Sequence, residues 1–207
     1  MRARSLVVVS AGLSQPSATR LLGERLADAT LTELRGLDID ATVEAIDLRD
    51  HAQDLTNNLL TGFPSPSLRT AVDAVHAADG LIAVSPIFSA SYSGLFKMFF
   101  DVLERDGLHG TPTLLAATGG TARHSLALDH AMRPLFAYLG AATVPTAVFA
   151  ASEDWGAGEA GPRDRLAERI ARAATELAIW MARHEPAAPS DPFSAPIPFE
   201  RLLRGEG

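Results

Sequence analysis

The 207-residue chain contains no cysteine. This absence excludes disulfide bonds, thiolate nucleophiles and cysteine-ligated iron–sulfur clusters together. Any oxidation or reduction that the protein carries out must therefore depend on a bound cofactor.

Long hydrophobic runs are absent as well. No apolar stretch reaches the roughly 18 residues that a membrane-spanning helix needs. The apolar start of the chain is too brief for a signal peptide, because Val7, Val8 and Val9 are followed at once by Ser10 and Gly12. We therefore expect a cytoplasmic protein without a membrane partner.

Positive charge is scarce relative to negative charge, with 18 lysines and arginines against 25 aspartates and glutamates. The formal net charge of −7 provides no general attraction for nucleic acid. The loop after the first apolar run also carries neither a GxGxxG motif nor a P-loop lysine. These absences argue against nucleic-acid binding and against a pyrophosphate or triphosphate site in that loop.

The rest of the sequence alternates short apolar runs with amphipathic stretches. The expected strands are 5–10, 41–47, 80–85, 113–118 and 142–150, and the expected helices begin near 17 and cover 67–78, 93–105, 124–139 and 162–184. Residues 48–66, rich in Asn, Gly and Pro, are expected to form a long loop with one helical turn. This alternation predicts a three-layer α/β fold, with helices on both faces of a five-stranded parallel sheet of the flavodoxin-like order 2-1-3-4-5.

We expect a single domain over residues 1–184. Residues 185–207 follow it as a proline-rich tail, with large apolar side chains at Phe193, Ile197, Phe199, Leu202 and Leu203. Two interpretations of this tail stay open: an arm that docks on the domain or on a partner subunit, and a disordered extension.

The loop after the first strand is rich in hydroxyl groups, at Ser10, Ser14, Ser17 and Thr19. It leads into the N-terminus of a helix, where free backbone N–H groups and the helix dipole favour an anion. Small side chains let a phosphate approach, and a monophosphate suits the site best. The alternative is that Ser14 or Ser17 simply caps the helix.

Two further loops follow the third and fourth strands, and the carboxyl ends of these strands should meet the first loop at the switch point of the sheet. A flat ring would then lie between residues 86–92 and 118–121. Gly119 and Gly120 would let backbone N–H groups reach the carbonyl oxygens of such a ring, or would form a bare turn. Phe88 and Tyr92 would stack on the ring or pack against a neighbouring subunit.

Several stretches together carry a family resemblance over about residues 5–150: the serine-rich loop, ADGLIAVSPIF, SASYSGLFK followed by Asp101, and ATGGTARHSLALDHAMRPLFAYLGA. The chain resembles the NADPH-dependent FMN reductase family, and within it the flavin reductases of two-component monooxygenase systems. The resemblance implies a flavodoxin-like fold and hydride transfer from NADPH or NADH to FMN. It also implies a homodimer or homotetramer and a flavin-dependent monooxygenase as partner.

The resemblance also implies which residues hold FMN. The phosphate would be held by Ser10, Ser14, Ser17, Ala18 and Thr19, and the isoalloxazine ring would be framed by Pro86, Ile87, Phe88, Ser89, Thr118, Gly119 and Gly120. Many family members place an arginine in the phosphate loop, where this chain has Ser14 and Gln15. Either Arg20 replaces that arginine, or the flavin binds more loosely. Because the hydride passes between two organic rings, we assign no catalytic residue and no metal ligand.

Two features of the later helices have a structural and an interface interpretation. Pro134 interrupts a helical pattern and should kink the helix or widen it at His130, where the resemblance implies a π-type bulge in a subunit interface. Lys97 and Asp101 are spaced for an exposed ion pair, and their match to the family leaves an interface role open.

Two other functions stay open at this stage. One is a quinone or azo reductase that keeps its FMN bound. The other is an electron carrier like flavodoxin, although the tail and the modest acidity of the chain argue against it.

Overall fold

The computed structural model describes residues 3–104, 107–155 and 162–185. A parallel sheet lies at its centre, formed by β1 (Arg4–Ser10), β2 (Ala41–Asp47), β3 (Gly80–Phe88), β5 (Pro112–Gly119), β6 (Ala142–Thr143) and β7 (Val148–Ala151). The short β4 (Ser91–Tyr92) returns antiparallel along β3. Residues 186–207, and with them almost all of the expected tail, lie outside the described residues.

The sheet order is β2-β1-β3-β5-β6, and β7 also pairs with β5. The expected order 2-1-3-4-5 is therefore present, with β5 in the fourth position and β6 and β7 sharing the fifth. The fifth strand is interrupted because β5 advances from Thr113 to Ala116 while its neighbour advances from Thr143 to Val148. Residues 144–147 therefore stand opposite only Leu114 and Leu115 of β5. They include Pro145, which has no N–H to donate to a ladder.

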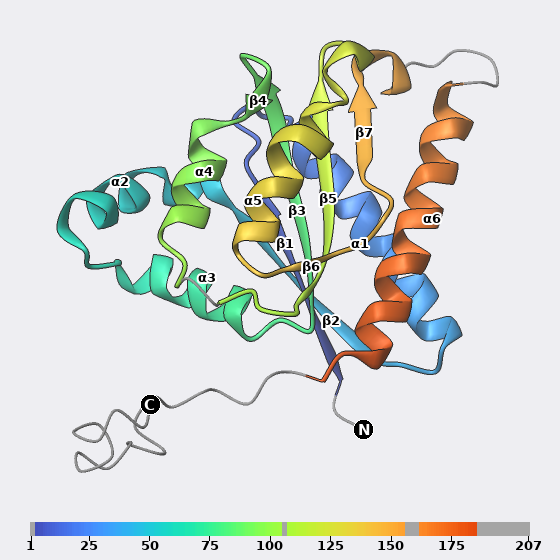
Figure 1. Cartoon of the computed structure of the whole chain (residues 1–207), viewed down its shortest axis with the longest axis horizontal. Coiled ribbons are helices and arrows are strands. Elements are labelled where there is room, and N and C mark those ends of the chain that lie inside the picture. The colour runs from blue at the N-terminus through green and yellow to red at the C-terminus, as the bar shows by residue number, and fades with distance from the viewer. Residues whose placement is uncertain (1–2, 105–106, 156–161, 186–207) are drawn as a thin grey trace, which may run out of the picture.

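Helices cover both faces of the sheet, as Figure 1 shows. One face carries α1 (Ala18–Gly36) and α6 (Pro162–Arg183), and the other carries α2 (Ala52–Thr61), α3 (Pro66–His76), α4 (Gly94–Asp101) and α5 (Arg133–Tyr138). Each face has its own buried apolar cluster. The strands supply alternate side chains to the two clusters, with Val7 and Val9 on one side and Leu6 and Val8 on the other.

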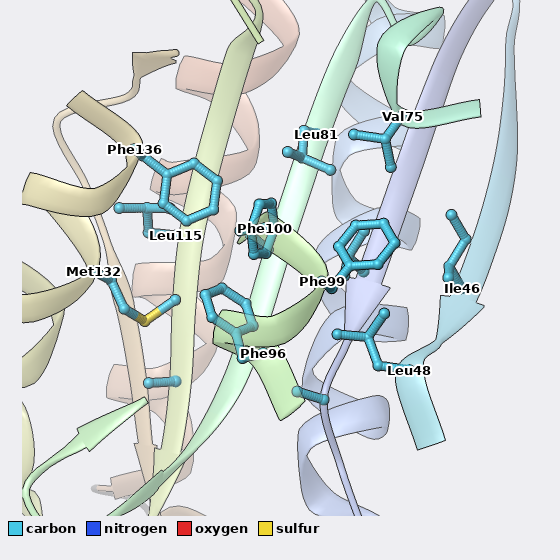
Figure 2. Packing of buried hydrophobic residues seen from close by; sticks show 14 of the residues in the cluster. Ile46, Leu48, Val75, Leu81, Phe96, Phe99, Phe100, Leu115, Met132 and Phe136 are labelled. Atoms are coloured by element: carbon cyan, nitrogen blue, oxygen red, sulfur yellow. The ribbon is translucent and has the colours of Figure 1, made fainter. Parts of the chain in front are cut away.

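Phenylalanines dominate the core beneath α4 and α5, as Figure 2 shows. The ring centroids of Phe96 and Phe100 are 4.6 Å apart, and those of Phe100 and Phe136 are 4.8 Å apart. Offset and tilted aromatic pairs of this kind add about 0.5–1.5 kcal/mol each to the burial of their surface. The Phe100–Phe136 pair joins α4 to α5 over this face of the sheet.

The expectation of a long loop over residues 48–66 is wrong. The segment forms a short 3₁₀ helix, η1 (Leu48–His51), followed by α2, which ends at Gly62 with a left-handed φ of 78°. Ala52, Leu55 and Leu59 recur at helical spacing on α2, and Leu55 is buried. The Asn, Gly and Pro residues of the segment favoured a loop and outweighed this pattern. Asp54 on α2 accepts hydrogen bonds from Ser65 and Ser67 at the start of α3.

The expected widening at His130 is confirmed. Residues Leu128–Met132 form a π-helical turn (η3), in which the N–H of Arg133 bonds to the carbonyl of Leu128 five residues earlier. Pro134 favours this geometry because it has no N–H for an α-helical bond to His130. The expected helix over 124–139 is thus divided into η2 (Ala122–His124), the π-helical turn and α5.

Within the described ranges, no helix is both long and apolar enough to cross a membrane.

Candidate active site

The candidate site lies at the edge of the sheet where β1, β3 and β5 end. The hydroxyls of Thr19 and Thr118 are 2.8 Å apart and hydrogen-bonded, and both residues are buried. This bond joins the start of α1 to the end of β5. The sheet ladder places Pro86 opposite Thr118. The serine-rich loop, the end of β3 and the Gly119–Gly120 loop are therefore neighbours, as the switch-point argument predicted.

The serine-rich loop closes tightly over the N-terminus of α1. Ser17 is the N-cap, and its hydroxyl accepts a hydrogen bond of 3.2 Å from the N–H of Arg20. A Cβ at Gly12 would overlap the Ser17 Oγ, so a larger residue there would displace the capping hydroxyl. The capping interpretation is correct for Ser17, whereas Ser14 and Ala18 are exposed beside the free end of the helix. The loop thus presents backbone N–H groups and a hydroxyl to solvent.

Ser10 does not join this group of exposed hydroxyls. Its side chain is buried, and its Oγ has no hydrogen-bond partner among the described residues. Ser10 lines a cavity of about 140 Å³ between α1 and β2, together with Val8, Ala27 and Val43. A phosphate on the outside of the loop would be reached by Ser14 more readily than by Ser10.

Residues 86–92 form a β-hairpin, which corrects the expectation that the strand ends at Ser85 and a loop follows. Ile87 pairs with Tyr92 and Phe88 pairs with Ser91. The two turn residues, Ser89 and Ala90, have φ values of 49° and 68°, the left-handed conformation of a two-residue hairpin turn. Neither residue is glycine, so the turn is strained, and strain of this kind is common at functional sites.

The base of this hairpin is rigid and its tip is exposed. The Ser85 hydroxyl accepts a 2.9 Å hydrogen bond from the N–H of Ser93, which in turn caps α4. Pro86 and Ile87 are buried, whereas Phe88 is 49% exposed. Among the ring-framing candidates of this segment, Phe88 and Ser89 are therefore the ones that project into solvent.

The two glycines after β5 differ in their surroundings. A Cβ at Gly119 would meet the ring of Phe149 at 2.8 Å, so this position packs tightly against β7. A Cβ at Gly120 would meet no described atom within 4 Å. The backbone of Gly120 therefore faces open space, and it suits the close approach of a planar ligand. Together with the open N-terminus of α1, this arrangement fits a flavin mononucleotide.

Arg20, the candidate replacement for the missing loop arginine, is already paired. Its Nε donates to Glu24 Oε1 at 2.8 Å and its Nη1 donates to Asp47 Oδ2 at 2.9 Å. The hydrogen bond to Glu24 and then the charge of Asp47 raise the pKa of the guanidinium above its usual value. The Arg20 side chain is exposed, but its guanidinium bonds to the carboxylates of Glu24 and Asp47 and makes no contact with the serine-rich loop.

Residues 4–156 match the NADPH-dependent FMN reductase family. An FMN reductase (NADPH) from Pseudomonas aeruginosa is 41% identical over 151 residues, which cover 72% of this chain and 78% of that protein. An NADH-dependent FMN reductase, SfnF, from Pseudomonas putida is 38% identical over 148 residues, which cover 72% of this chain and 77% of that protein. The chain belongs to the NADPH-dependent FMN reductase family.

Solved structures agree with this assignment. An oxidoreductase from Corynebacterium diphtheriae is 44% identical to the reductase, with a TM-score of 0.85 over 89% of this chain and 100% of that one. An NADH:FMN oxidoreductase, EmoB, is 31% identical, with a TM-score of 0.74 over 91% of this chain and 93% of that one. The expected flavodoxin-like fold, oxidoreductase class and use of FMN with NADPH or NADH are confirmed.

Sequence reasoning missed three parts of this site. It did not find the Thr19–Thr118 bond, the partner of Arg20 at Asp47, or Trp155, whose ring lies 4.9 Å from the Arg25 guanidinium. These residues are far apart in the chain, so no local pattern could have joined them. The chain also contains one GxGxxG match, GAGEAG at residues 156–161, which lies outside the described residues.

Proposed function

We propose that this reductase binds FMN as a dissociable substrate, reduces it with NADPH or NADH, and supplies the reduced flavin to a partner monooxygenase. The observation that carries the proposal is the pairing of Arg20 with Glu24 and Asp47. The loop that would receive the phosphate has no arginine of its own, and the candidate replacement is already neutralised by two carboxylates. A cytoplasmic location and an assembly of two or four subunits remain predictions from the sequence.

The phosphate of FMN would lie at the N-terminus of α1, where backbone N–H groups and the hydroxyl of Ser14 are available. Ser17 contributes through its backbone and through the shape of the loop, because its hydroxyl already caps the helix. Ser10 would contribute by its position as the last residue of β1, where the loop begins, and its buried hydroxyl would not contact the phosphate. Phosphate binding through neutral donors is weaker than binding through a charged guanidinium.

The ring would lie between the tip of the β3–β4 hairpin and the Gly119–Gly120 loop. When bound, FMN supplies an acceptor for the two electrons of the nicotinamide, and the protein needs no general base for that reaction. The task of these residues is to hold the two rings at about 3–3.5 Å with the reacting atoms aligned. The turn at Ser89 and Ala90, with its left-handed backbone, would form one wall of the ring site. The exposed backbone of Gly120 would form the other.

The experiment that tests the proposal measures oxidation of NADPH and NADH by the purified protein when FMN is supplied at increasing concentration. We expect turnover that depends on added FMN, and protein that loses its flavin on gel filtration. Failure to oxidise either nucleotide with FMN would refute the reductase function. Protein that retains FMN through gel filtration and reduces a quinone would instead identify the enzyme as a flavin-retaining quinone reductase.

A further inference from the structure

The cavity of about 140 Å³ between α1 and β2 lies at the edge of the sheet, because β2 is an outer strand. Val43 and Ala45 of β2 line it on one side, and Ala27 and Leu31 of α1 line it on the other. Ala27 and Ala45 are small, so the helix and the strand leave space that larger side chains would fill. None of the residues proposed to frame the flavin ring lines this cavity.

The volume of the cavity suits one small organic group. An apolar protein cavity of roughly 150 Å³ stays free of water and holds a benzene molecule. Most of the wall here is apolar as well. A buried water typically makes about three hydrogen bonds, and such a wall offers it few partners. The cavity therefore favours an apolar ring or a branched alkyl group over water.

One buried polar group at this cavity lacks a partner. Ser10 is 3% exposed, and its Oγ has no hydrogen-bond partner among the described residues. Side chains of β1 alternate between the two faces of the sheet, and those of Leu6 and Val8 lie on the α1 face. Ser10 is next in this series, and it lines the cavity together with Val8. Buried hydroxyls are rarely left unpaired, so this one points to a polar group that a ligand would supply.

The charged residues around the cavity are mainly acidic. Glu24, Asp28 and Asp47 line it, and Arg20 is the only cation among the described residues of its wall. Arg20 is already bound to Glu24 and Asp47. Asp28 is exposed and forms no ion pair with any residue that the structure describes. The excess of negative charge favours a cation at this site.

We propose that this cavity binds a small organic amine, with its apolar body between α1 and β2 and its ammonium group toward Ser10 and Asp28. An ammonium group has three donors and no acceptor, which matches a hydroxyl and a carboxylate. The serine then gains the partner that it lacks, and the charge of Asp28 is neutralised. A neutral alcohol would satisfy Ser10 alone, and an acid would meet an excess of like charge. The site goes beyond flavin reduction, because it involves neither the flavin ring nor the nicotinamide.

The test is isothermal titration calorimetry with benzylamine, benzyl alcohol and benzoate, which share one ring and differ in charge. At pH 7 the amine is protonated. We expect benzylamine to bind about two- to fivefold more tightly than benzyl alcohol, the size of one exposed charge contact, and benzoate to bind most weakly. Replacement Ser10→Ala should weaken the binding of benzylamine and of benzyl alcohol about three- to tenfold, because both lose a hydrogen bond.

A charge variant separates the two polar contacts. Asp28→Asn should weaken benzylamine binding about threefold and leave benzyl alcohol binding unchanged. Asp73→Asn is the matched control, because Asp73 is exposed on α3, on the other face of the sheet, and does not line the cavity. An equal loss of benzylamine affinity in the two variants would attribute the effect to net charge and overturn the proposal.

A larger side chain in the cavity distinguishes this site from binding elsewhere on the protein. Ala45→Leu should abolish the binding of benzylamine and benzyl alcohol, because the added side chain occupies the cavity. Ala45 is exposed on an edge strand, so the variant should keep its fold. Thr42→Leu is the matched control, since Thr42 is exposed on the same strand and does not line the cavity. Benzylamine binding that persists in Ala45→Leu, or wild-type protein that binds none of the three compounds, would overturn the proposal.

Discussion

Gly119 and Gly120 bring the backbone to the candidate site for two different reasons. At Gly119 a Cβ would press against Phe149, which is buried in the core. At Gly120 a Cβ would enter the space that we assign to the flavin ring. One glycine is therefore required by packing and the other by the ligand.

This difference is testable with two alanine variants. Gly119→Ala should lower the free energy of unfolding by about 1–3 kcal/mol, because the ring of Phe149 must shift in a close-packed interior. Gly120→Ala should unfold like the wild type in urea, yet bind FMN more weakly in a fluorescence titration. Wild-type FMN affinity in Gly120→Ala would show that the ring lies elsewhere.

The carboxylates around Arg20 lead to a second prediction at this scale. Replacements Glu24→Gln and Asp47→Asn together should release the guanidinium and tighten FMN binding about three- to tenfold, while riboflavin, which has no phosphate, binds as before. Asp50→Asn is the control, since the charge of Asp50 acts on Arg20 but its carboxylate accepts no hydrogen bond from it. An equal gain in Asp50→Asn would attribute the effect to net charge alone.

His184 provides a prediction of pH dependence. Burial is the main cause that lowers the pKa of His184 below 6.5, with the charge of Arg4 adding to it and that of Asp79 opposing it. The unfolded chain therefore binds more protons than the native protein in the pH range just below 6.5. Stability should fall as the pH decreases through that range, and stay constant above it. Urea unfolding between pH 7.5 and 5.5 should show a shallower decline in His184→Gln than in wild type.

At the scale of elements, Arg133 holds the interrupted fifth strand in place. Its guanidinium, at the start of α5, donates to the Thr143 hydroxyl and to the carbonyls of Val144 and Pro145, each at 3.1 Å. These carbonyls lie where the ladder with β5 is broken between β6 and β7. The side chain thus replaces the strand partner that the interruption removes.

Replacement Arg133→Met should therefore destabilise the protein. We expect the free energy of unfolding to fall by about 1–3 kcal/mol, because the part-buried Val144 carbonyl and Thr143 hydroxyl lose their donor while the apolar stem is retained. Arg123→Met is the control, because Arg123 is exposed and its side chain bonds to no described residue. Equal urea midpoints for the two variants would contradict this role.

The helices and strands of this protein differ in how far local pattern reveals them. The apolar stripe of α1 and the buried runs of β1, β3 and β5 are visible in the sequence because burial imposes their period. By contrast, the apolar residues of α2 stand among Asn, Gly and Pro residues that favour a loop, and the hairpin turn places Ser89 and Ala90 where a pattern-based expectation would look for glycine or asparagine. In both elements, residue composition points away from the structure that forms.

At the scale of the whole molecule, the remaining question is how subunits assemble. The α4 ion pair between Lys97 and Asp101 is exposed in the single chain, and Lys97 is the only lysine of the sequence. If this surface lies between subunits, Lys97→Glu should reduce the native mass measured by light scattering, while Arg123→Glu leaves it unchanged. An unaltered mass in Lys97→Glu would place the subunit contact on another face.

The sequence by itself determined the strand–helix alternation and the location of the three loops, because hydrophobic period and turn residues act over short distances. The order of the sheet followed from the length and spacing of these elements. Only the tertiary structure decided what the side chains in those loops do. Arg20 is held by Asp47, 27 residues away, and Ser10, whose hydroxyl is buried, lines a cavity between α1 and β2. Such contacts depend on which elements pack together, and no local pattern records that.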